Sequence, residues 1–118
     1  GDAPEHFISV SMDRFEKVTA GSGVVLRPWL QAFHWRTKTY SPEYILKQVS
    51  SSHAHHGDGF LFWNAANDYS KPFAAMPTMM ANPQTYLYTP ATAVAQSSPA
   101  PAAAEKTGQT EAATQPRQ

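Results

Sequence analysis

The stretch GFLFWNAANDY, residues 59–69, decides how the rest of the chain is interpreted. Phe60 to Trp63 is an unbroken run of large apolar residues, too short for a helix and too apolar for a strand with one face in water. The run therefore predicts a strand buried on both faces, as in a parallel sheet. Polar residues follow at once, so we expect the strand to deliver them to the carboxyl end of a sheet, where α/β proteins bind ligands. These residues are Asn64, Asn67, Asp68 and Tyr69, with Trp63 beside them.

A second apolar segment, residues 24–32, follows a glycine-rich turn. Its β-branched residues favour a strand. Pro28 cannot donate to a β-ladder, so we expect a bulge or the end of the strand at that position. Residues 34–40 are polar and aromatic without a period, which is typical of a loop.

A helix over residues 42–56 is predicted to join the two strands. Ser41 is a good N-cap, Pro42 suits the first helical position, and Glu43 complements the positive end of the helix dipole. Gly57 is expected to cap the C-terminal end and to begin the turn into the next strand.

Two further helices are predicted outside this unit. Apolar residues recur every three or four positions over residues 4–20, which favours a helix, although the alternation over residues 8–12 leaves a strand as the alternative. Residues 71–80 are expected to be helical only in part, because Pro72 and Pro77 limit the length of a helix.

A strand, a crossover helix and a second strand form a βαβ unit, whose strands are parallel. The predicted fold class is therefore α/β. Two strands do not make a stable sheet alone, so we expect the chain to be the end of a larger fold.

The aromatic residues of this 118-residue chain are unevenly placed. All Trp, Phe and Tyr residues lie within residues 1–88, whereas residues 89–118 consist mainly of Ala, Pro, Ser, Thr and Gln. Such a segment buries too little apolar surface to offset the entropy of ordering it. We therefore expect one folded domain over residues 1–88 and a disordered tail over residues 89–118.

Charge and composition argue against several classes of partner. Nine basic and nine acidic residues give a formal net charge of zero, so nucleic acid is not an expected partner. No run approaches the roughly 18 apolar residues of a membrane span. The chain has no Cys, and His53 and His56 lie three apart without a zinc-type signature, so no metal or cofactor is expected.

Two motifs, RPWLQxF at residues 27–33 and GFLFWNxxNxY at residues 59–69, occur in this order with a predicted helix between them. Together they resemble the C-terminal end of the bacterial putative glycosyl hydrolase domain, a family placed among the TIM-barrel glycoside hydrolases. The resemblance covers about residues 24–69. The matching residues between the motifs are Tyr40, Gln48 and Val49.

The resemblance implies that residues 24–32 are the seventh strand of a barrel and residues 60–64 the eighth. A barrel of this kind has eight strands and about 250 residues. The chain would then be the C-terminal two βα units of an incomplete barrel, with the rest of the barrel as its partner. In that family the position after Trp-Leu-Gln is often acidic, but here it is Ala32, and Gln31 cannot ionise. The catalytic carboxylates are therefore expected mainly outside this chain, which alone should be inactive.

Aromatic and amide side chains at the strand ends are the predicted carbohydrate contacts. The face of an aromatic ring matches the C–H surface of a sugar, and neutral amides both donate to and accept from hydroxyl groups. Each also has a plainer interpretation, in which the ring fills the core and the amide satisfies loop backbone. The predicted contacts are Trp29, Gln31, Trp63, Asn64, Asn67 and Tyr69.

Glycoside hydrolysis normally needs two carboxyl groups, about 5–5.5 Å apart for retention and roughly 6.5–9.5 Å for inversion. Asp68 is the candidate catalytic residue of this chain, although capping a turn or the following helix is the more common role of an aspartate in such a loop. Glu43 is more simply a first-turn carboxylate.

The sequence thus predicts the C-terminal portion of a glycoside hydrolase that supplies sugar-contacting residues. The alternative is a non-catalytic carbohydrate-binding or structural barrel fragment. An extracytoplasmic location is expected for an enzyme that acts on glycans.

Overall fold

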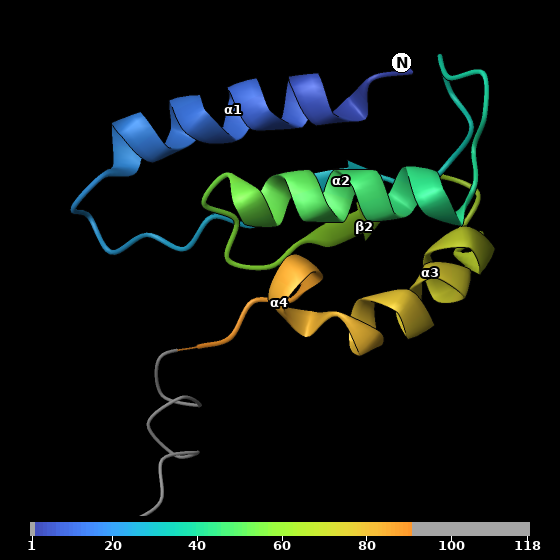
Figure 1. Cartoon of the computed structure of the whole chain (residues 1–118). Helices are drawn as coiled ribbons and strands as arrows, with labels where there is room; N and C mark the ends of the chain where they lie inside the picture. The colour runs from blue at the N-terminus through green and yellow to red at the C-terminus, as the bar shows by residue number, and fades with distance from the viewer. Residues whose placement is uncertain (1, 91–118) are drawn as a thin grey trace, which may run out of the picture.

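The computed structural model of the chain describes residues 2–90 (Figure 1). The predicted tail lies almost entirely outside them. Helices and strands alternate along the first part of the chain, and two helices follow. The elements are α1 (Pro4–Thr19), β1 (Trp29–Gln31), α2 (Pro42–Ala54), β2 (Leu61–Trp63), α3 (Ser70–Ala81) and α4 (Pro83–Tyr86).

The two strands form a parallel sheet, which confirms the predicted βαβ unit and the α/β class. The register pairs Leu30 with Phe62 at the centre of the ladder. β1 is shorter than the predicted strand over residues 24–32, because Pro28 has no N–H to donate. Before the ladder, the N–H of Asp58 donates to the carbonyl of Leu26 at 2.7 Å, which holds the two chain segments together.

Helix α2 begins as the sequence predicts, with Ser41 as N-cap accepting from the Tyr44 N–H. Its C-terminal end differs from the prediction. His56, not Gly57, adopts the left-handed conformation, with φ of 68°. The N–H of Gly57 then donates to the carbonyl of Ser52 at 2.8 Å, as in a Schellman motif. The backbone of Gly57 therefore lies so close to Ser52 that a β-carbon has no space, and this close approach, not a left-handed conformation, requires glycine here.

The other helices also depart from expectation in detail. α1 is a helix, so the strand alternative was wrong, and no side chain caps its N-terminal end. The nearby Asp2 carboxylate accepts from the N–H of Lys38 at 2.6 Å. α3 runs through Pro77 without a break, at the loss of one backbone hydrogen bond.

The core lies between the sheet and the helices. α1 lies along one side of α2, and α3 and α4 lie along the other (Figure 1). Helices therefore pack only on one face of the sheet within residues 2–90. The buried cluster consists of Leu30, Ala32, Ile45, Val49, Ala75 and Met79.

The opposite face of the sheet is apolar and open to solvent. The prediction that β2 is buried on both faces was wrong, because the exposed fractions of Leu61 and Trp63 are 42% and 51%. Trp29, which pairs with Leu61, is 68% exposed. Of the run Phe60 to Trp63, the residues that pack against the core are Phe60 and Phe62. The run Phe60 to Trp63 has the composition of a strand that is buried on both faces, but nothing within residues 2–90 covers its outer face.

Candidate functional site

Because β1 and β2 are parallel, their carboxyl ends lie at the same edge of the sheet. The loop that follows β1 and the loop that follows β2 meet there. The N–H of Ala32 donates to the carbonyl of Trp63 at 3.0 Å, which joins the two strand ends directly. The predicted site residues therefore belong to neighbouring segments.

An open groove of about 510 Å³ lies on the solvent face of the sheet at this edge. The Phe33 and Trp63 rings meet edge to face, with centroids 5.2 Å apart. Phe33 and Trp35 were not predicted as site residues, because they lie in or beside an aperiodic loop. We call this feature the aromatic groove. Its lining residues are Trp29, Leu30, Gln31, Phe33, Trp35 and Trp63.

The Gln31 side chain holds the loop that carries two of these rings. Its amide nitrogen donates to the carbonyls of Phe33, at 2.7 Å, and Trp35, at 3.0 Å. The amide oxygen is therefore the remaining group that could accept from a ligand. Gln31 thus has a structural role, and its predicted contact with a carbohydrate stays a prediction.

The backbone of Gln31 is held in turn by Gln48 of α2. The Gln48 amide oxygen accepts from the Gln31 N–H at 3.0 Å, and its nitrogen donates to the Gln31 carbonyl at 2.8 Å. Gln48 is only 3% exposed. The Gln48 side chain thus satisfies both the N–H and the carbonyl of Gln31, the last residue of β1.

Replacing Gln48 by Met should therefore destabilise the chain by about 1–3 kcal/mol, because the Gln31 N–H and carbonyl lose their partners. Lys47→Met is the matched control, since its exposed ammonium makes only a 3.6 Å ion pair with Glu5. That control should cost under about 1 kcal/mol. The measurement is the midpoint of urea unfolding, and equal shifts for the two variants would contradict this role of Gln48.

Asn64 ties together the ends of both strands. Its amide nitrogen donates to the carbonyls of Ala32, at 2.6 Å, and Asp68, at 2.7 Å, and its oxygen accepts from the Ala66 N–H at 2.7 Å. Asn64 is 9% exposed. Both amide hydrogens of Asn64 are donated to backbone carbonyls of the chain. The geometry therefore fits the plainer interpretation of Asn64, in which its amide satisfies loop backbone.

The other predicted residues lie in the loop after β2. Asn67 is exposed and left-handed, with φ of 61°. Tyr69 is half-buried and packs against the core cluster. The Asp68 carboxylate accepts from the Ser70 N–H at 2.9 Å, at the start of α3. That hydrogen bond, more than the nearby Lys71, lowers the pKa of Asp68. Asp68 is not among the residues that line the aromatic groove.

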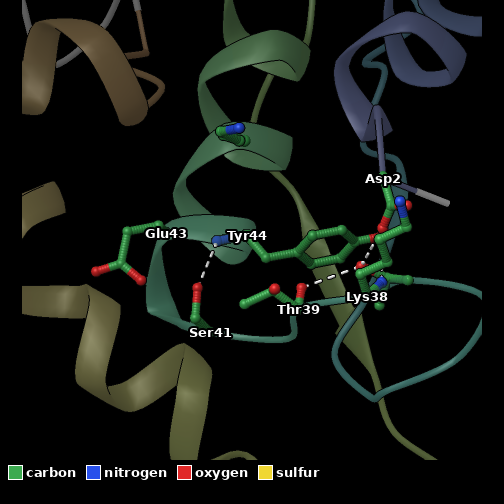
Figure 2. Close-up of a pocket in the computed structure, with 8 residues that line it drawn as sticks. Asp2, Lys38, Thr39, Ser41, Glu43 and Tyr44 are labelled. Atoms are coloured by element: carbon green, nitrogen blue, oxygen red, sulfur yellow. Dashed lines mark hydrogen bonds between the residues drawn. The ribbon is translucent and has the colours of Figure 1, made fainter.

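A second, more polar cavity of about 530 Å³ lies at the N-terminal end of α2 (Figure 2). The Tyr44 ring extends from α2 toward Asp2 in this view. The N–H of Lys38 lowers the pKa of Asp2, and the Ser41 hydroxyl lowers the pKa of Glu43. Both carboxylates thus have hydrogen-bond partners within the chain, and the contact of Glu43 with Ser41 fits its simpler interpretation as a first-turn carboxylate.

Stability should fall as the pH drops below about 4, because three carboxyl groups have a lower pKa in the folded chain than in the unfolded chain. Each contributes stability above its unfolded pKa and loses that contribution as the pH falls through its folded pKa. The test compares melting temperatures at pH 6 and pH 3. In a variant that combines Asp2→Asn, Glu43→Gln and Asp68→Asn, the difference between the melting temperatures at pH 6 and pH 3 should be much smaller. An equally large difference in this variant would show that these three carboxyl groups do not cause the loss of stability in acid.

The histidines of α2 contact different elements. His53 lies 3.1 Å from the carbonyl of Gln84, and His55 lies 2.8 Å from the Asp13 carboxylate in α1. Within residues 2–90, no group of three or more His, Asp or Glu side chains could hold a metal ion. In the same part of the chain, no helix combines the length and apolar character needed to span a membrane.

The structure is therefore that of an α/β protein with two parallel strands and an aromatic groove at the carboxyl end of its sheet. The model of the putative glycosyl hydrolase domain family matches residues 2–69, more than half of the chain, and the chain belongs to this family. The match spans α1, the sheet and the loop that ends at Tyr69. No curated protein and no solved structure matches the chain.

Proposed function

We propose that the chain is the C-terminal part of a glycoside hydrolase barrel, with β1 and β2 as its last two strands. Two consecutive parallel βα units with helices on one face support this arrangement. In such a barrel the opposite face of each strand points into the interior, where other strands cover it. The exposed Leu61 is a residue that this interior would cover, whereas Trp63 would lie at the open, carboxyl end of the barrel. Residues 1–88 would then be the folded part of the domain.

The aromatic groove is the proposed carbohydrate site, and the observation that carries this proposal is its position. Trp63 is exposed at the carboxyl end of β2, the end at which barrel enzymes bind substrates, and the exposed Trp29, the first residue of β1, lines the same groove. The Trp63 ring offers a flat apolar surface to a sugar ring, and the Gln31 oxygen offers an acceptor. Asn64 would act by shaping the loop, while Asn67 and Tyr69 remain proposed contacts.

Catalysis by this chain alone is not expected. The aromatic groove has no carboxyl group among its lining residues, whereas the reaction normally uses two. The lowered pKa of Asp68 keeps it ionised near neutral pH, so it could serve as a base or nucleophile but not as the acid. The acid and its partner would lie in the remainder of the barrel.

The direct test is hydrolysis of chromogenic glycosides by the full-length protein. Trp63→Ala should raise KM about tenfold through the loss of ring stacking. Phe73→Ala is the matched control, because Phe73 is a 73% exposed aromatic residue on α3, outside the groove. An unchanged KM in the Trp63 variant would remove this ring from the site.

The alternative is a non-catalytic carbohydrate-binding fragment, which the lack of carboxylates along the groove favours. The sequence upstream of this chain distinguishes the two. Acidic residues at the ends of a fourth and a sixth barrel strand support an enzyme. Sugar binding without hydrolysis by the full-length protein supports the alternative.

A further inference from the structure

The aromatic groove continues into two neighbouring cavities, of about 420 and 370 Å³, that share Trp29 and Leu30 with it. Two of the residues lining these three cavities are charged, Arg27 and Arg36, and both are cationic. No Asp or Glu of residues 2–90 lines any of the three. The three cavities therefore combine aromatic rings with two cationic side chains, of which Arg27 is hydrogen-bonded to the carbonyl of Asp58.

Arg36 is held in a specific place on this surface. Its guanidinium carbon lies 4.5 Å from the centre of the Trp35 ring, a cation–π arrangement. Its backbone is left-handed, with φ of 51°, a conformation that residues other than glycine rarely adopt. The two hydrogen bonds from Gln31 to the preceding loop stabilise this geometry. Arg36 forms no ion pair with any carboxylate of residues 2–90.

We propose that the aromatic groove and the adjoining cavity lined by Arg36 together bind an acidic glycan, one that carries carboxylate groups on its sugar rings, and that Arg36 receives one of these carboxylates. This inference rests on the proposed carbohydrate site and names its substrate class. The guanidinium fork matches a carboxylate in a bidentate arrangement, which a neutral sugar cannot provide. Because the Arg36 guanidinium lies over the Trp35 ring, Trp29 and Trp63 are the rings that stack on the sugars, next to the group that binds the carboxylate.

The experiment titrates the full-length protein with a hexamer of galacturonic acid and with a neutral glucose hexamer, by isothermal calorimetry at low and high salt. The acidic hexamer should bind at least tenfold more tightly at low salt, and high salt should reduce this preference. Arg36→Gln should weaken binding of the acidic hexamer about tenfold and leave the neutral hexamer unchanged.

Lys38→Gln is the matched control, because Lys38 lies on the same loop but lines the polar cavity, and neither the aromatic groove nor the two cavities beside it. It should change binding less than twofold, and circular dichroism checks that both variants fold. Equal affinity for the two hexamers, with no effect of Arg36→Gln, overturns the acidic-glycan inference but leaves the carbohydrate site intact. Binding of neither hexamer overturns both.

Discussion

Replacing Gly57 by Ala should destabilise the chain by about 3 kcal/mol, because an added β-carbon has no space. It would lie 2.5 Å from the carbonyl oxygen and 2.9 Å from the carbonyl carbon of Ser52, and closer still to the Ser52 hydroxyl. Backbone atoms of a helix end cannot move aside as a flexible side chain can. The substitution would also disturb the hydrogen bond from the Gly57 N–H that closes α2. Urea unfolding followed by circular dichroism measures the loss.

Gly21→Ala is the matched control for this substitution. Gly21 has a φ of 74°, but an added β-carbon there would meet no atom within 4 Å. The cost there should be about 1 kcal/mol, from backbone strain alone. Equal losses at the two positions would show that the close contact at Ser52 does not govern the stability of this turn.

The second large effect is expected for Asn64→Asp, about 3 kcal/mol or more at neutral pH. The replacement removes both amide hydrogens and places a buried carboxylate against the carbonyl oxygens of Ala32 and Asp68. Asn67→Asp is the control, because the exposed Asn67 occupies a left-handed conformation that aspartate also tolerates. It should cost under about 0.5 kcal/mol.

Acid provides a further check on Asn64→Asp. The difference in unfolding free energy between the variant and the original chain should shrink as the pH falls, because a protonated carboxyl can donate one hydrogen bond again. A difference that is the same at pH 7 and pH 4 would mean that the amide hydrogens of Asn64 are not what holds the strand ends together.

Local signals in the sequence predict much of this fold. Ser41, Pro42 and Glu43 specify the start of α2, because capping depends on a few adjacent residues. The parallel pairing follows from the order strand, helix, strand. The family resemblance also agrees with the match over residues 2–69.

Features that depend on distant contacts were not predictable. The run Phe60 to Trp63 is apolar throughout, and composition cannot tell which segment covers its outer face. The reciprocal hydrogen bonds between Gln48 and the Gln31 backbone join residues 17 positions apart. The aromatic groove could not be predicted for a similar reason. Trp35 belongs to a loop without hydrophobic periodicity, and only the fold brings it to the groove.

The most direct test of the account is a crystal structure of the full-length protein with a bound oligosaccharide. We expect β1 and β2 to be adjacent parallel strands of a closed barrel, with a sugar ring stacked on Trp63 in the aromatic groove. An oligosaccharide bound away from the aromatic groove, or β1 and β2 outside a barrel, would contradict the central claim.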